Sequence, residues 1–200
     1  MKTPIFTTLG LMTFLVGCVP TYSLVQGSAV SVGTLQVDAS TNWNRAPNVH
    51  APYLRKGSEL WTLDGARLDR IVIIPGVADG EALIKAPGNK AAALPIFRAD
   101  MLPNEIEELA ESTFVKLFGE GNAAVTTENL RPSSFGEHRG IMFDVSAAVT
   151  DSPDEKGTVG AFIANEQLYM IFFLAATPYY HDKHAGNALS VIKSARLLKQ

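Results

Sequence analysis

The sequence predicts an α+β fold, in which two long helices pack on an antiparallel β-sheet. Several β-prone runs are joined by short turn sequences, which favours antiparallel neighbours. Two longer segments, at residues 103–118 and 180–197, carry apolar residues at helical spacing. Strands and helices do not alternate regularly, so a parallel sheet built from strand-helix-strand units is not expected.

The first strand is expected between Val30 and Val37, where apolar and polar residues alternate around a bend at Gly33. Residues 38–52 are rich in Asn and Pro and are expected to form an ordered loop. Trp43 lies in this loop, and we interpret it as a lid on one edge of the core rather than as a ligand-stacking residue.

A β-hairpin is predicted next, because Asp64-Gly65 stands between β-prone runs at residues 59–63 and 68–75. An Asp-Gly pair in this setting is the strongest short-range signal for a hairpin turn. Residues 82–85 are expected to form at most a short edge strand, because glycines and prolines flank them. Residues 86–99 show little pattern and are expected to run over the surface of the sheet.

The clearest helix runs from Pro103 to Phe118 and is followed by Gly119. Proline is favoured at the first helical position, and glycine just beyond the last one. Four glutamates between residues 105 and 111 suit the positive end of the helix dipole, so we interpret them as a solvated face rather than a cation site. The apolar stripe consists of Ile106, Leu109, Ala110, Thr113, Phe114, Leu117 and Phe118.

Four more strands are expected at residues 123–130, 140–149, 158–164 and 168–176. The last is apolar throughout from Leu168 to Leu174, which predicts a central strand buried on both faces. The chain closes with a predicted helix over residues 180–197 that packs on the sheet. Residues at helical offsets along it are Ala185, Leu189, Ile192 and either Ala195 or Arg196.

The N-terminus has the layout of a secretory signal peptide. Lys2 is its only charge, an apolar run continues to Val16, and the small residue Gly17 follows. The apolar run is too short to cross a bilayer as a permanent helix, which takes about 20 residues. We therefore expect residues 1–17 to be removed.

The end of this run, Leu15-Val16-Gly17-Cys18, resembles a bacterial lipobox. The resemblance implies diacylglycerol transfer to the Cys18 sulfur, cleavage before Cys18 and acylation of the new N-terminus. Two or three acyl chains hold a protein firmly on a membrane, whereas one chain binds reversibly. Cys18 is the only cysteine, so no intramolecular disulfide can form, and a thioether would remove a reactive thiol. The alternative is an ordinary signal peptide, cleaved between Val19 and Ser23.

This interpretation divides the chain into a signal peptide (1–17), a lipidated N-terminus with a short tether (18–30) and a single domain (31–200). The chain carries 17 Lys and Arg against 20 Asp and Glu, a net charge of −3. These charges are interspersed and form no basic stretch, so we expect neither a nucleic-acid partner nor a basic surface for anionic lipid.

The sequence contains no recognisable catalytic or nucleotide-binding motif, and we expect no cofactor. His181 and His184 are the metal-ligand candidates, because residues three apart on a helix share a face and could reach one ion. Two ligands do not close a metal site, and His50 and His138 are distant in sequence. We therefore interpret His181 and His184 as exposed residues at the entry of the last helix.

A polar cluster of Arg131, Arg139 and Asp144 is expected around the turn at Phe135-Gly136. Ion pairs at the end of a sheet are common in proteins of every class. We name no catalytic residue.

The order of elements resembles the PsbP-like group, which includes the DcrB-type bacterial lipoproteins. The likeness rests on that order, on the mid-chain helix beginning at Met101-Leu102-Pro103-Asn104-Glu105-Ile106, and on the final apolar strand feeding Val191-Ile192-Lys193-Ser194-Ala195-Arg196-Leu197. It covers most of residues 30–197. The resemblance implies an α+β domain that binds other molecules or helps to assemble complexes without doing chemistry itself.

From the sequence we expect a membrane-anchored periplasmic lipoprotein that binds a protein or another component of the cell envelope. Val19 stands where some bacterial lipoproteins carry an aspartate for inner-membrane retention, which favours the outer membrane. Two alternatives stay open: a hydrolase-like enzyme whose carboxylates converge only in the fold, and a periplasmic metal-binding protein.

Overall fold

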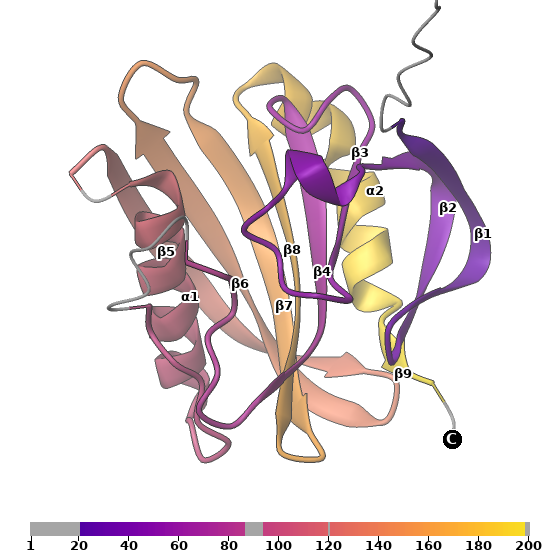
Figure 1. Ribbon diagram of the computed structural model, residues 1–200, viewed down its shortest axis with the longest axis vertical. Coiled ribbons are helices and arrows are strands. Elements are labelled where there is room, and N and C mark those ends of the chain that lie inside the picture. Colours follow the sequence, from indigo (N-terminus) through magenta and orange to yellow (C-terminus); the bar gives the residue numbers. More distant parts are fainter. Residues whose placement is uncertain (1–20, 87–93, 120, 199–200) are drawn as a thin grey trace, which may run out of the picture.

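The computed structural model describes residues 21–86, 94–119 and 121–198, which form a nine-stranded sheet with one long helix on each face (Figure 1). Neighbouring strands follow the order β1-β2-β3-β4-β8-β7-β6-β5, and the short β9 pairs with β2. Every strand pairing is antiparallel. The predicted fold class is confirmed, although the sheet makes up more of the domain than the helices do.

The elements have the following bounds. The strands are β1 Ser23–Val32, β2 Leu35–Arg45, β3 Glu59–Thr62, β4 Asp69–Ala78, β5 Ala123–Phe135, β6 His138–Val149, β7 Glu155–Ala164, β8 Gln167–Ala176 and β9 Arg196–Leu197. The helices are the 3₁₀ turn η1 Asn48–His50 and the α-helices α1 Pro103–Phe118 and α2 Tyr179–Lys193. In the described ranges, no helix has the length and apolar character needed to span a bilayer.

Strand β8 is the centre of the domain, as its apolar sequence predicts. It pairs with β4 on one side and β7 on the other, and every residue from Leu168 to Ala176 is buried. Even-numbered side chains such as Phe172 enter the core beneath α1, and odd-numbered ones such as Phe173 enter the core beneath α2. Strand side chains alternate between faces, so this one strand supports both layers of the domain.

Helix α1 has the bounds that its sequence predicts. The buried residues of α1 are Ile106, Leu109, Ala110, Thr113 and Phe114. The Glu105 carboxylate accepts a hydrogen bond from the Leu102 backbone N–H at 2.7 Å, which satisfies a donor at the helix start. Glu111 accepts from the Thr127 hydroxyl at 2.7 Å, so this glutamate also joins α1 to strand β5.

The N-terminal part differs from the sequence prediction. Residues 30–37 form a hairpin rather than one bent strand, because Gly33 adopts a φ of +56° and lets Val32 pair with Leu35. The alternating pattern resembled a single strand because both strands of the hairpin direct apolar side chains into the same core. Strand β1 begins at Ser23, so most of the described part of the expected 18–30 tether lies in the sheet.

Two predicted loops also contain structure. Strand β2 continues to Arg45 and places Trp43 fully within the core beneath α2, so the loop prediction for residues 38–45 is wrong. Phe97 is fully buried, which contradicts a purely superficial path for residues 86–99. Its backbone bonds to Glu81 and Gly80 hold it against the sheet. Residues 87–93 of that segment lie outside the described part.

The C-terminal elements are shifted from their predicted positions. Strand β5 runs on to Phe135, helix α2 ends at Lys193, and Arg196–Leu197 forms β9 instead of a last helical turn. Of the residues predicted at helical offsets, Ile192 is buried within α2, Ala195 is buried just beyond the end of the helix, and Ala185 and Leu189 are only partly buried. The fully buried residues of α2 are His184, Ala188, Val191 and Ile192.

Substitutions at two glycines give a matched test of how closely β7 approaches β8. A side chain at Gly157 of β7 would collide with the backbone carbonyl of Phe173 in β8, whereas one at Gly186 of α2 meets nothing within 4 Å. We expect Gly157→Ala to destabilise the domain by about 3 kcal/mol. Gly186→Ala should stabilise it by about 1 kcal/mol, because alanine is the better helix former. Urea unfolding measures both changes, and equal effects of the two substitutions would contradict the close approach of β7 and β8.

Candidate functional site

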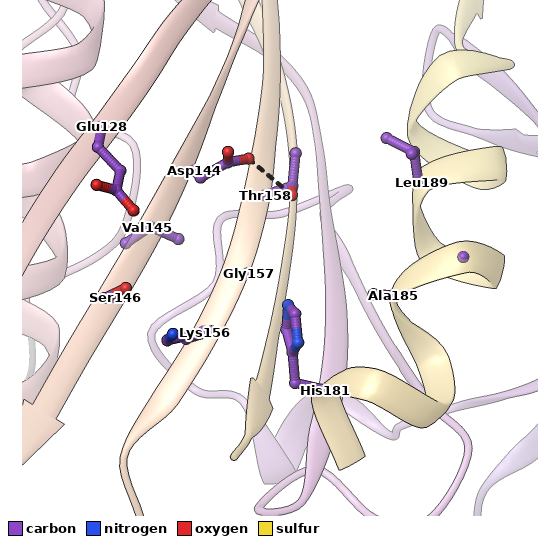
Figure 2. Close-up of a pocket in the computed structure, with 11 residues that line it drawn as sticks. Glu128, Asp144, Val145, Ser146, Lys156, Gly157, Thr158, His181, Ala185 and Leu189 are labelled. Carbon is purple, nitrogen blue, oxygen red and sulfur yellow. Dashed lines mark hydrogen bonds between the residues drawn. The ribbon is translucent and has the colours of Figure 1, made fainter. Parts of the chain in front are cut away.

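An open groove of about 350 Å³ lies between α2 and the outer half of the sheet (Figure 2). Its floor is a cross-strand row formed by Glu128 of β5, Asp144 of β6 and Thr158 of β7. Ser146 and Lys156 form the next row. Side chains of paired residues in neighbouring strands lie on one face, so the register alone gathers these polar groups.

The wall of the groove comes from the first three turns of α2. His181, Ala185 and Leu189 recur at intervals of four residues and therefore share one side of the helix. Helix α2 packs mainly on β8, β2 and β7, which leaves much of β5 and β6 uncovered on this face. The groove is thus amphipathic, with polar groups on the sheet and, beyond His181, small or aliphatic side chains on the helix.

The Asp144 carboxylate is hydrogen-bonded to three side chains at the floor of the groove. It accepts hydrogen bonds from Arg131 Nη2 at 2.9 Å, from Asn129 Nδ2 at 3.1 Å and from Thr158 Oγ1 at 3.1 Å. Partial burial alone would raise the pKa of the Asp144 carboxyl, but these hydrogen bonds outweigh burial and hold the pKa below its ordinary value of 3.8. Asp144 is therefore a fixed negative charge at neutral pH rather than a proton donor.

The expected cluster at this position is confirmed in two of its three members. Arg131 and Asp144 form an ion pair. Arg139 pairs in register with Ser134 near the tip of the hairpin. It lies on the other face of β6 from Asp144, because side chains alternate along a strand.

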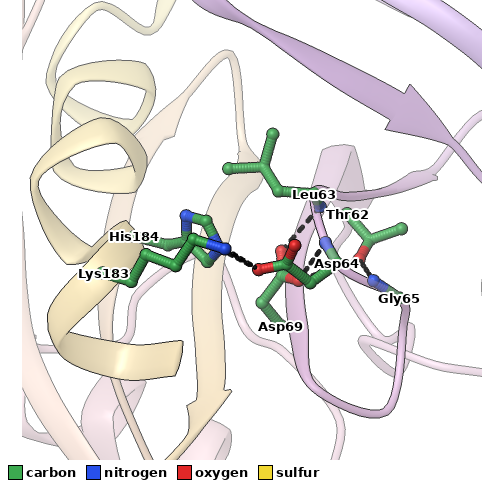
Figure 3. A network of polar contacts seen from close by, with 7 residues as sticks. All are labelled: Thr62, Leu63, Asp64, Gly65, Asp69, Lys183 and His184. Carbon is green, nitrogen blue, oxygen red and sulfur yellow. Dashed lines mark hydrogen bonds and ion pairs between the residues drawn. The ribbon is translucent and has the colours of Figure 1, made fainter. Parts of the chain in front are cut away.

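A second polar cluster holds the Asp-Gly turn between β3 and β4 (Figure 3). The buried Asp69 carboxylate accepts hydrogen bonds from the backbone N–H groups of Leu63 and Asp64, both at 2.7 Å. It also accepts from the Thr62 hydroxyl at 3.2 Å, and that hydroxyl accepts from the Gly65 N–H at 2.8 Å. Asp69 thus satisfies the backbone donors that the turn leaves without strand partners.

Asp64 extends from this turn to the first turns of α2. Its Oδ2 atom lies 2.6 Å from Lys183 Nζ and 2.6 Å from His184 Nε2. The hydrogen bonds from Lys183 and His184 hold the pKa of the Asp64 carboxyl below its ordinary value. The contact joins segments about 120 residues apart in the chain and fixes how α2 begins.

The two candidate metal-ligating histidines have different partners. His184 is buried and faces Asp64, so its interpretation as an exposed residue is wrong. His181 borders the groove, and its Nδ1 atom lies 3.1 Å from the Asp182 carboxylate.

A different set of groups could approach one cation. The ligand atoms of Asp64, Asp69 and His184 all lie within 4.8 Å of one another. However, Lys183 already supplies a positive charge to Asp64, and Asp69 accepts three hydrogen bonds within the turn. The arrangement is explained by its role in joining the turn to α2. The Asp64-Gly65 pair in the sequence predicted the turn. It did not predict that Asp64 contacts Lys183 and His184 of α2.

Comparison with known proteins identifies the fold. No protein-family model matches the chain, and neither does any curated protein sequence. Among solved structures, the domain is similar to cyanobacterial PsbP (CyanoP) from Synechocystis sp. PCC 6803, with a TM-score of 0.58 over 94% of this chain and 98% of that chain. The chain has a PsbP-like fold. Sequence identity to CyanoP is only 10%, so the PsbP-like likeness concerns the fold alone.

A second solved structure matches less well. It is the Ran-binding protein Mog1p of Saccharomyces cerevisiae, with a TM-score of 0.42 and 9% identity over 90% of this chain and 96% of that chain.

The Asp64 contact predicts a pH-dependent contribution to stability. Asp64→Ala removes the partner of the buried His184 imidazole and should cost about 1–3 kcal/mol near neutral pH. Because the pKa of Asp64 is lowered by folding, this contribution is present above the ordinary value of 3.8 and is lost as the pH falls below it. Thermal unfolding from pH 3 to pH 7 measures the difference between the variant and the wild type.

The matched control is Asp154→Ala, which removes an exposed carboxylate from the turn before β7. We expect little change in stability for this control at any pH in the range. A deficit for Asp64→Ala that stays constant down to pH 3 would contradict the assigned role of its carboxylate.

Proposed function

We propose that the protein is a lipid-anchored, periplasm-facing module of the cell envelope that binds another envelope protein in the groove beside α2. The observation that carries this proposal is the groove itself, whose polar floor and aliphatic wall face each other across an open space. Glu128 and Asp144 supply negative charge, Lys156 supplies positive charge, and Ala185 and Leu189 supply apolar contact. A protein segment of mixed charge with one apolar side chain complements such a surface.

The edge strand β5 favours docking into the groove over addition of a strand to the sheet. Edge strand β5 has an irregularity between Glu128 and Arg131, where Asn129 has a φ of +58°, and it contains Pro132. The backbone N–H of Thr127 is bound by Glu111 of α1 at 3.2 Å. Sheet edges are commonly protected against pairing with a further strand by bulges, by prolines and by hydrogen bonds that already satisfy the backbone groups of the edge strand.

The chemistry of the groove supports binding over hydrolysis. General acid catalysis by a carboxyl group requires a pKa near the working pH, whereas that of Asp144 is lowered. This carboxylate already accepts hydrogen bonds from Arg131, Asn129 and Thr158, so it acts as a fixed charge that orients a partner. Binding without chemistry is also what the PsbP-like resemblance implies.

Anchoring is inferred from the signal layout and the lipobox-like sequence before Cys18. Strand β1 begins at Ser23, so few residues separate the domain from the proposed anchor. A module held this closely meets only partners in or near its own membrane. Val19, in place of an aspartate after the cysteine, favours the outer membrane as that location.

The anchor has a direct test in the protein purified from its host. We expect the mature chain to begin at Cys18 and to carry the mass of a diacylglycerol and an additional acyl chain. Mass spectrometry of the N-terminal peptide measures both features. A mature chain beginning between Val19 and Ser23, or a Cys18 without acyl mass, would refute the anchor.

The groove has an independent test in intact cells. A photo-crosslinking amino acid at Glu128, on the groove floor, should capture a defined envelope protein, and one at Glu108 on the solvent side of α1 should not. Lys156→Glu reverses a groove charge and should reduce the Glu128 crosslink about tenfold, since close like charges oppose docking.

The matched control for the charge reversal is Lys85→Glu, a change at an exposed lysine outside the groove. This control should leave the crosslink unchanged. Equal crosslinking from Glu108 and Glu128, or insensitivity to Lys156→Glu, would exclude the groove as the binding site.

A further inference from the structure

An exposed apolar patch lies where strand β1 begins. It consists of Tyr22, Leu24, Val49 and His50, and we call it the β1 patch. Tyr22 is 38% exposed, Leu24 57% and Val49 64%, although all three belong to or adjoin ordered elements. Exposed aliphatic side chains beside an aromatic one are a common feature of interaction surfaces.

The patch is held together by a contact between β1 and η1. The rings of Tyr22 and His50 lie 5.3 Å apart, and the Tyr22 hydroxyl is 3.2 Å from His50 Nδ1. Tyr22 and Leu24 are two residues apart and point to the same side of the chain. Val25, the next residue, points to the opposite side and is buried in the core. Val49 precedes His50 within η1. The contact therefore brings two distant segments to one surface.

The stretches of sequence that contain the patch residues carry no charged side chain, and Arg45, which lies opposite Ser23 in the strand register, is paired with Glu59 at 2.6 Å. From Val19 to Val37 the chain contains no Asp, Glu, Lys or Arg, and residues 46–52 contain none either. A surface that enters the boundary between lipid headgroups and acyl chains has to avoid burying charge. Tyrosine suits that boundary, because its ring is apolar and its hydroxyl remains among polar groups.

The distance from the proposed anchor decides what this patch can meet. Tyr22 follows Cys18 by four residues, and four residues span at most about 14 Å when fully extended. Amphipathic surface segments bury their apolar face about 5–10 Å into the headgroup and acyl boundary. A patch tied this closely to an acylated residue cannot leave the neighbourhood of the bilayer surface.

We propose that the β1 patch inserts into the boundary layer of the membrane that carries the anchor, so that the domain has a fixed orientation on it. This inference rests on the proposed lipidation of Cys18. Strands β1 and β5 lie at opposite ends of the strand order, so the β1 patch shares no strand with the groove on β5, β6 and β7. Insertion of the patch therefore uses none of the groove residues, which stay available to a protein partner.

Tryptophan fluorescence in vesicles tests the insertion. The full protein from its host is reconstituted into phosphatidylcholine and phosphatidylglycerol vesicles, with or without bromine atoms on the acyl chains. Trp43 and Trp61 are fully buried in the core and give a constant background. In the Leu24→Trp variant we expect brominated lipid to reduce the added emission about twofold or more, because an inserted ring lies within reach of the bromines.

The matched control is Leu102→Trp. Leu102 is 60% exposed at the start of α1, and α1 packs on β5 and β6 at the other edge of the sheet. Brominated lipid should leave its emission unchanged. Adding Val49→Asp to the Leu24→Trp variant should abolish the quenching, since a carboxylate resists insertion. Quenching that is absent from Leu24→Trp, or equal in Leu24→Trp and Leu102→Trp, overturns the proposal.

Mass spectrometry of the same samples keeps the two proposals distinguishable. Acylated Cys18 without quenching at position 24 refutes the patch and leaves the anchor intact. Absence of acyl mass refutes the anchor. In that case a form of the protein that retains Cys18, the only cysteine in the chain, is coupled to a maleimide phospholipid in the same vesicles, and the quenching measured there decides the patch.

Discussion

Strand β8 is buried on both faces, and this double burial governs the layering of the whole domain. One strand supplies apolar side chains to two cores, so each face of the sheet needs its own cover. Helix α1 covers one face near β5 and β6, and α2 covers the other near β8, β7 and β2. On the α1 side, Arg70 of β4 and Glu155 of β7 form a bidentate ion pair across β8, with distances of 2.8 and 2.5 Å. The three central strands are thus joined by backbone pairing, apolar contact and charge.

The candidate groove is a consequence of this layering. A single helix is narrower than a sheet of this width, so α2 leaves the outer strands of its face without cover. Polar residues can occupy those strands because they face water, and the β5-β6-β7 register aligns Glu128, Asp144 and Thr158 in one row. The position of α2 that creates the groove is fixed at its start by Asp64, which reaches it from the turn between β3 and β4.

The two proposals assign separate tasks to opposite edges of the sheet. The edge formed by β1 carries exposed apolar side chains close to the proposed lipid anchor, and the edge formed by β5 borders the groove. Such a division suits a module that has to face a membrane and a protein partner at the same time. The similarity to CyanoP concerns the fold alone, and neither surface is inferred from it.

Local signals in the sequence were sufficient to predict several elements. The bounds of α1, the hairpin at Asp64-Gly65 and the central place of β8 follow from capping residues, turn chemistry and an unbroken apolar run. The sequence also predicted that Arg131 and Asp144 would cluster, because they lie on either side of one turn, and the two residues form an ion pair. Other features could not be predicted from such signals: His184 is buried, Trp43 belongs to a strand, and Glu128, Lys156 and His181 border one groove. The reason is that burial and proximity depend on partners far away in the chain, and the pattern around each residue carries no record of those partners.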